Sequence, residues 1–368
     1  NPCPIFTLRG KKRYQIILKS SKKNDVNGKL LHNLIRKKLF DKINFYNRKK
    51  LKISIDVDPN NLLWKPNMKN FIIYILISKI LFSQSAFQSI ELIYDSKSLG
   101  ISGVGISNIN SDESEFQNPS LLANNDKKLK LSFIQYPANI NSHYFKYTTK
   151  FKNLSLSGNY KGINFGNFER YDNDGIHFGQ FSARDNLFGM SIANSLTENS
   201  ALGFSLSLFQ SRIDDLNSIL GLITIGGNIN FPTENFSLGG VIRNIGLIFD
   251  HFTTYEEMIP SSAGLGISKK LEYLPLTIYS DIIWWKSRTI FKIGGEFVIN
   301  KNFQLQFGTS SEKNNFNTDL LWRDIFSGFS SGFSYNTGRH SIDMSLLNNG
   351  IAGILIGIGI SSKLNWNF

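Results

Sequence analysis

The end of the chain alternates between apolar and small or polar positions. From residue 354 to 368, one set of alternate positions carries isoleucines and ends in Trp366 and Phe368, while the other set is mostly glycine and polar residues. Successive side chains of a strand point to opposite faces, so this pattern predicts a β-strand with one apolar face. The pattern is typical of an outer-membrane barrel strand with an aromatic girdle, although a soluble sandwich strand has a similar one.

Short strands separated by polar turns recur from residue 127 to the end of the chain. Fifteen segments qualify: 129–136, 143–151, 154–164, 176–182, 186–195, 201–211, 219–230, 235–248, 260–268, 275–286, 288–298, 303–311, 327–336, 340–347 and 351–364. Barrels of this class have an even number of strands, so we interpret 176–182 as loop or as half of a neighbouring strand. The predicted fold is all-β, an antiparallel up-and-down outer-membrane β-barrel of about 14 strands over residues 127–368.

Residues 86–126 lack clean alternation and predict a different structure. They contain a glycine-rich stretch at 98–108 and an acidic stretch at 111–115. Asn118 followed by Pro119 suits the start of a helical turn, because asparagine caps the free amide groups and proline fits the first helical position. We expect this segment to be a short N-terminal hatch, or plug, of the barrel.

Met68 opens a stretch with the features of a secretory signal. A lysine follows it, then an apolar run over 71–82, and small residues at Ser83 and Ser85. A charged start, a short apolar centre and a small-x-small end predict a signal peptide over 68–85, with Ala86 as the mature N-terminus. The alternative is a buried helix of a soluble protein.

The basic charge is confined to the first 67 residues. They hold 17 lysine or arginine residues against four acidic residues, which equals the formal charge of +13 of the whole chain. Residues 68–368 are therefore neutral overall, and we expect no nucleic-acid partner for them. The leader carries "RGKKRYQIILKS" at 9–20, a helix-like stretch at 28–40 and "LKISIDVDPNNLL" at 51–63, a small α+β pattern.

This leader, with its strand followed by Asp-Val-Asp-Pro at 56–59, resembles the C-terminal domain of the primosomal replication helicase PriA. It contains no P-loop and no zinc-binding cysteine cluster, so the resemblance implies no helicase activity. We interpret residues 1–67 as the tail of an upstream gene joined by read-through of the gene prediction. A genuine fusion is the alternative.

Candidate reaction centres are weak throughout the sequence. Cys3 is the only cysteine, and the five histidines lie far apart without ligand spacing. "YDNDG" at 171–175 is more typical of a hairpin turn than of a calcium loop. "GFSSG" at 328–332 contains Ser330 in the pattern of a nucleophile elbow but lies in an alternating strand with no helix after it. We therefore predict no catalytic, cofactor-binding or metal site and no enzyme activity.

Four motifs in the exported part together point to a family. An Asn-Pro-Ser-Leu motif contains Asn118, Pro119 and Leu121. The other three are "FGNFERYD", "NIG" and "GISKK", which occupy residues 165–172, 244–246 and 266–270. They resemble motifs of the PorQ family, outer-membrane barrels of the type IX protein secretion system. One departure is that the Ala-Leu-Gly-Gly element of the family's hatch is reduced to "GISG" at 100–103.

The resemblance implies a non-enzymatic anchor in the outer membrane. Members of this family are expected to hold a PorZ-like partner of the attachment complex at the cell surface. Extracellular loops would make the contact, and we expect the loops at 212–218, 248–260 and 311–325 to do so. The main candidate residues lie in one of these loops and are Asp250, Phe252, Tyr255, Glu256 and Glu257. The expected partners are thus outer-membrane lipid, this surface protein and the barrel-assembly machinery.

An alternative function is a hatch-gated channel for hydrophobic small molecules. The PorQ-like barrels share their N-terminal hatch with long-chain fatty-acid transporters, which belong to the same broad class. An apolar lumen would favour the channel, whereas a lumen filled by polar and bulky side chains would favour the anchor. Alternation assigns the two faces of each strand but leaves this choice open.

We predict that removing residues 366–368, which include Trp366 and Phe368, prevents insertion of the barrel. The C-terminal strand ending in an aromatic residue is expected to be the signal for barrel assembly, and it also closes the barrel. Immunoblotting of outer-membrane fractions measures the effect. Wild-type amounts of the truncated protein in that fraction would contradict the prediction.

Overall fold

The computed structural model describes residues 2–8, 11–14, 33–35, 37–38, 87–109, 117–172, 174–252, 257–286, 288–312 and 326–364. The chain forms two compact units, residues 1–79 and 80–368. In the first unit, β1 (Pro2–Leu8) pairs antiparallel with β2 (Lys11–Tyr14). The predicted strand at 51–63 and the predicted signal peptide at 68–85 lie outside the described residues. Among the described residues, no helix is long and apolar enough to cross a membrane.

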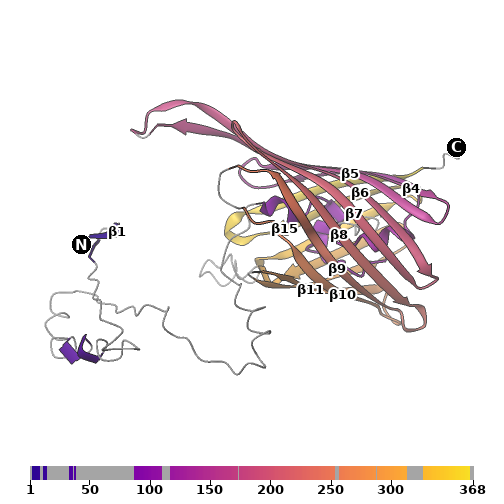
Figure 1. The fold of residues 1–368 in the computed structure, drawn as a ribbon. Coiled ribbons are helices and arrows are strands. Elements are labelled where there is room, and N and C mark those ends of the chain that lie inside the picture. Colours follow the sequence, from indigo (N-terminus) through magenta and orange to yellow (C-terminus); the bar gives the residue numbers. More distant parts are fainter. Residues whose placement is uncertain are drawn as a thin grey trace, which may run out of the picture. The chain divides into compact units, whose positions relative to one another are not determined.

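Within the described part of the second unit, fourteen antiparallel strands form a closed barrel (Figure 1). Each strand pairs with its neighbours in the chain, and β16 pairs with β3 to close the barrel. This confirms the predicted up-and-down barrel and its strand number. The strands are β3 (Lys128–Gln135), β4 (Asn141–Phe151), β5 (Leu154–Tyr171), β6 (His177–Thr197), β7 (Ser200–Ile213), β8 (Leu216–Phe231), β9 (Phe236–Asp250), β10 (Ser262–Lys270), β11 (Leu276–Trp285), β12 (Thr289–Val298), β13 (Phe303–Ser310), β14 (Phe329–Asn336), β15 (His340–Asn348) and β16 (Ile354–Lys363).

The C-terminal strand β16 has the two faces that its alternation predicts. Ile354, Ile356 and Ile358 are exposed on the outer face of the barrel, whereas the alternate positions from Leu355 to Ser361 are buried on the inner face. Exposed large apolar side chains recur in the same way on the other strands. Closure of the barrel gives the backbone N–H and C=O groups of the edge strands hydrogen-bond partners, which the hydrocarbon core of a membrane cannot supply. Because the outer surface is also apolar, the chain is an outer-membrane protein.

The hairpin β5–β6 is longer than the alternation predicted and projects beyond the other strands (Figure 1). The doubtful segment 176–182 is part of β6 and continues into 186–195, as half of one strand. In β5 the pairing shifts between Asn164 and Gly166, and Gly166 has a φ of 89°. A bulge at a glycine interrupts the period of two, which is why the prediction ended β5 at residue 164.

Connections at the two ends of the barrel differ in length. The turns after β4, β6 and β14 are short, whereas the connections 251–261 and 311–328 at the opposite end are longer. Outer-membrane barrels have short periplasmic turns and longer extracellular loops. We therefore call the end with the longer connections the outer end. The projecting β5–β6 hairpin lies there, as do the described parts of the predicted partner loops. The loop predicted at 212–218 is a two-residue turn, because β7 ends at Ile213 and β8 begins at Leu216. Residues 313–325 of the loop predicted at 311–325 lie outside the described residues. Two short 3-10 helices also lie in connections, η6 (Pro232–Glu234) and η8 (Gly350–Ala352).

The predicted hatch lies inside the barrel (Figure 1). It consists of η3 (Gln88–Glu91), α4 (Ser96–Gly100) and η5 (Pro119–Asn124). The helix α4 packs on the strands β13 to β16 and β3, and η5 packs on β5 to β8. Glycines on the inner wall allow this close approach: a Cβ atom at Gly203 would lie 2.3 Å from the carbonyl carbon of Pro119, and one at Gly239 would lie 2.2 Å from the carbonyl oxygen of Ile106.

Candidate functional site

The hatch motif begins the turn η5 and fixes it to the wall. The side-chain oxygen of Asn118 accepts hydrogen bonds from the backbone N–H of Ser120 at 3.1 Å and from its hydroxyl at 2.7 Å. The amide nitrogen of Asn118 donates to the carbonyl of Ile106 in the hatch at 2.8 Å and to that of Gly227 in β8 at 3.0 Å. Leu121 is fully buried. The cap predicted at Asn118 is present, and it also joins two hatch segments to the barrel.

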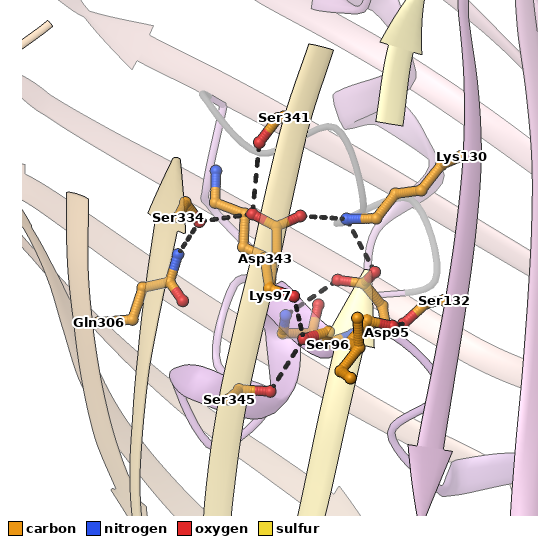
Figure 2. Close-up of polar contacts among 12 residues, drawn as sticks. Asp95, Ser96, Lys97, Lys130, Ser132, Gln306, Ser334, Ser341, Asp343 and Ser345 are labelled. Carbon is orange, nitrogen blue, oxygen red and sulfur yellow. Dashed lines mark hydrogen bonds and ion pairs between the residues drawn. The ribbon is translucent and has the colours of Figure 1, made fainter. Parts of the chain in front are cut away.

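A buried ion cluster holds the other end of the hatch (Figure 2). Lys130 Nζ lies 2.8 Å from Asp95 Oδ1 and 3.4 Å from Asp343 Oδ2, and each of the three side chains is at most 2% exposed. Asp95 also caps α4, because its other oxygen accepts from Ser98 N at 2.9 Å. The cluster thus connects the first turn of α4 with two wall strands. The ion pair of Lys97 with Glu296 of β12, 3.7 Å, adds a further contact from α4.

The strands β3 and β15, which carry Lys130 and Asp343, lie on either side of β16. Hydroxyl groups surround the carboxylate of Asp343: Ser334 donates to it, and Gln306 donates to Ser334 at 2.7 Å (Figure 2). Ser96 of the hatch donates from its backbone N–H to the hydroxyl of Ser132 at 2.9 Å. Burial of charges is tolerated where each is paired and hydrogen-bonded, as here.

Two further polar contacts hold the middle of the hatch. Asp281 of β11 accepts from the backbone N–H groups of Gly105 at 2.7 Å and Ile106 at 3.1 Å. Ser330, the centre of the "GFSSG" motif, donates to the carbonyl of Gly100 at 2.9 Å and accepts from Ser102 at 2.8 Å. Its hydroxyl therefore makes structural bonds to the hatch within a continuous strand.

An apolar cluster covers the hatch at the outer end. Phe87 and Ile90 of the hatch pack with Phe209 of β7 and with neighbouring leucines of β6 and β8. The rings of Phe87 and Phe252 stack with their centroids 6.0 Å apart. The first described residues of the hatch, including Phe87 and Ile90, thus lie among apolar side chains at the outer end of the barrel. The polar contacts described above lie deeper in the barrel.

The candidate partner loop is partly folded inward. Phe252 packs on the apolar cluster, and its backbone N–H donates to Glu257 at 3.0 Å. Asp250 lies at the end of β9, where it accepts from Asn217 at 3.3 Å. Tyr255 and Glu256 lie outside the described residues. Of the three that are described, Phe252 packs into the barrel, Asp250 bonds to β8, and Glu257 makes its contacts within the loop.

The "FGNFERYD" motif builds the projecting β5–β6 hairpin. Phe168 stacks on Phe181 of β6 with ring centroids 5.3 Å apart. Arg170 pairs with Asp214 and lies over the rings of Phe178 and Phe181. The carboxylate of Asp172 accepts two backbone N–H groups, which forms the hairpin turn predicted for "YDNDG".

A cavity of about 370 Å³ lies between the hatch and the wall of the barrel. Its lining is mixed: aromatic and aliphatic groups such as Tyr136, Leu187 and Trp285 alternate with charged groups such as Arg243 and Lys292. Tyr136 donates its hydroxyl to the carbonyl of Ile93 in the hatch at 2.7 Å. Burial raises the pKa of Tyr136, so its hydroxyl stays protonated and able to donate. The lumen is thus polar and filled around the ion cluster but open and partly apolar at this cavity.

The alternation of the strands predicts the inner face for Lys130, Asp343 and Arg243, but it does not single out these three residues. Each lies at an inner-face position next to an exposed apolar residue, as Lys130 does beside Leu131 and Arg243 beside Ile242. A charged residue on the inner face of a predicted strand is the signal that could have identified them. Trp285 also faces the cavity, whereas Trp284 is exposed on the outer face. Trp366 and Phe368 lie outside the described residues, and the described residues contain no cluster with the makeup of a metal site.

Comparison with known proteins agrees with the barrel fold. No protein-family model and no curated protein matches the sequence. A TodX monoaromatic hydrocarbon channel, the deltaS2S3 mutant, is similar in structure with a TM-score of 0.54 and 11% identity, covering 74% of this chain and 99% of that one. The CymD monoaromatic hydrocarbon channel has a TM-score of 0.50 and 11% identity, covering 75% of this chain and 98% of that one. At such identity the likeness establishes the fold alone.

We predict that Lys130→Met loosens the hatch and destabilises the barrel. The substitution leaves Asp95 and Asp343 buried without their shared cation, which costs about 3–5 kcal/mol of unfolding free energy. Urea unfolding of the detergent-solubilised protein measures the loss, and limited proteolysis of residues 87–126 measures release of the hatch. Lys150→Met, at the exposed end of β4, is the matched control and should change stability by less than about 0.5 kcal/mol. Equal stability of the two variants would contradict the prediction.

Proposed function

We propose that this chain is a hatch-plugged outer-membrane channel that admits hydrophobic small molecules from outside. The cavity between the hatch and the wall carries the proposal. Its volume of about 370 Å³ is in the range of small-ligand sites, and its lining combines aromatic and aliphatic side chains with a larger number of polar and charged groups. The similarity in fold to the TodX and CymD monoaromatic hydrocarbon channels supports the same function.

The distribution of contacts along the hatch suggests how such a channel would work. Near the outer end, the packing of Phe87 and Ile90, which an apolar solute can compete for, acts together with the hydrogen bonds of Ser89 to Asp185 and of Asn244 to Glu91. Deeper in the barrel, the ion cluster around Lys130 and the bonds of Asp281 hold it by directed polar contacts. A solute would therefore reach the cavity first, and passage to the periplasm would require displacement of the polar part of the hatch.

Toluene uptake tests this function. Cells that express the full chain should take up radiolabelled toluene several-fold faster than cells that carry an empty vector. Ser207→Trp places a large ring at the cavity wall and should reduce uptake to the background rate. Leu206→Trp on the same strand is the matched control, because Leu206 faces outward and is 54% exposed. Uptake by the wild-type chain at the rate of the empty-vector cells would refute the channel.

A second candidate function is the type IX anchor that the PorQ resemblance implies. The projecting hairpin favours it, because the resembling motif at 165–172 builds that hairpin. Phe168, Tyr171 and Phe178 are 42%, 58% and 58% exposed there. Exposed aromatic side chains are typical anchors of a protein interface. The ion cluster around Lys130 also fits an anchor, because a filled and rigid lumen is what such a role requires.

If the chain is a type IX anchor, the projecting β5–β6 hairpin should bind a soluble surface protein. The triple variant Phe168→Thr, Tyr171→Thr and Phe178→Thr should release a PorZ-like partner from cells of a type IX-secreting host. Immunoblots of whole cells and culture medium measure the release. Phe151→Thr, at the inner end of β4, is the control and should leave the partner on the cells. Full retention by the triple variant, at normal barrel levels, would count against the anchor.

A further inference from the structure

One charged side chain of the cavity is buried with unused hydrogen-bond donors. Arg243 of β9 lines the cavity and is 7% exposed. Its Nε and Nη2 atoms find no hydrogen-bond partner among the residues that the structure describes. A guanidinium group has five donors and stays charged, so leaving donors unused in a buried position is costly. The geometry therefore points to a ligand for this group.

Arg243 continues the inward-facing positions of β9 that include Gly239 and Val241, and a bulge follows it at Asn244. The pairing of β8 and β9 shifts between Ile223 and Ile225, and Asn244 has a φ of 57°. The side-chain nitrogen of Asn244 donates to Glu91 of the hatch and, at 3.2 Å, to the carbonyl of Pro260. Asn244 thus fixes the hatch and the outer loop, and Glu91 already accepts a bond from it.

A second unused polar group lies directly across the sheet from Arg243. Ser262 of β10 is the cross-strand partner of Arg243, is 5% exposed, and its hydroxyl finds no partner among the described residues. Side chains paired in this way lie with Cβ atoms about 4.5–5.5 Å apart on one face. Arg243 and Ser262 together present a fork of N–H donors and one O–H donor, which suits a carboxylate.

Several of the other charges around the cavity have contacts of their own. Arg288 pairs with Glu312 at 3.3 Å and lies over the ring of Trp285 at 4.8 Å. Lys161 lies over the ring of Tyr94 at 5.2 Å. Asp281 is within the field of Arg243 and Lys292. Its Oδ2 atom is bonded to two backbone N–H groups of the hatch, and its Oδ1 atom finds no hydrogen-bond partner among the described residues. Arg243 is therefore the charge best placed to take a ligand from the cavity.

Apolar groups next to this pair determine what else the ligand carries. Trp285 is the cross-strand partner of Ser262 on its other side and packs on the cluster of Val241 and Ile283. A carboxylate held by Arg243 and Ser262 would place the rest of its molecule along this apolar wall. A cavity of about 370 Å³ accommodates a molecule the size of benzoate.

We propose that Arg243 and Ser262 form the carboxylate-binding site for a small monocarboxylate with an apolar body. This deepens the proposed channel function and rests on it for entry of the ligand from outside. A neutral molecule of the same shape uses the apolar wall but leaves the guanidinium unpaired. The site therefore selects acids over their neutral counterparts.

Isothermal titration of the full chain in a nonionic detergent tests the site at pH 7.5. Benzoate should bind at least tenfold more tightly than benzyl alcohol, its neutral counterpart. Arg243→Gln should remove that preference, Arg243→Lys should restore part of it, and Ser262→Ala should weaken benzoate binding a few-fold. Unchanged binding of benzyl alcohol by the variants would show that they fold. Arg339→Gln, at an exposed inner turn, is the matched control and should bind benzoate as the wild type does.

Equal affinity for the two compounds, or full benzoate binding by Arg243→Gln, would overturn the site. Toluene uptake distinguishes rejection of the carboxylate site from rejection of the proposed channel function. Toluene uptake without a preference for benzoate would leave the channel standing and reject the carboxylate site. Arg243-dependent benzoate binding without toluene uptake would support the site and reject the channel.

Discussion

Closure of the sheet by β16 and β3 is the constraint on which the rest of this barrel depends. A lipid bilayer offers no hydrogen-bond partners, so an open strand edge cannot remain in it. The registration of β16 against β3 places Ile356 opposite Gln135 and Lys363 opposite Lys128. The same junction carries the ion cluster, because Lys130 and Asp343 lie on the strands that flank β16. The ion cluster therefore attaches α4 of the hatch where the first and last strands meet.

The lumen divides into two environments that meet different needs. Around Lys130 it is filled by buried charges and hydroxyl groups, each with partners on hatch and wall. Near Trp285 it is open and partly apolar. Neither an entirely apolar nor an entirely filled lumen describes this barrel. An anchor uses the rigid part, whereas a channel uses the open part, and the two functions make different demands on the same hatch.

Much of the fold could be predicted from the sequence because barrel strands alternate with a period of two. The strand count, the faces of β16 and the turn capped by Asn118 all rest on such local patterns. Bulges disturb the period, which is why the end of β5 beyond Gly166 was missed. The ion cluster depends on Lys130 and Asp343, which are 213 residues apart in the chain. Pairings of that kind, and the inward position of Phe252, depend on the closed structure and have no local signal.

The bulge at Asn244 has a consequence for communication across the membrane surface. Through one side chain, Asn244 bonds to the hatch at Glu91 and to the outer loop at Pro260, while its carbonyl accepts from Ser261 at 2.8 Å. A molecule that shifts the outer loop changes the free energy of the hatch contact. Thermodynamic linkage makes this coupling reciprocal, so a change in the position of the hatch also changes the conformational equilibrium of the outer loop.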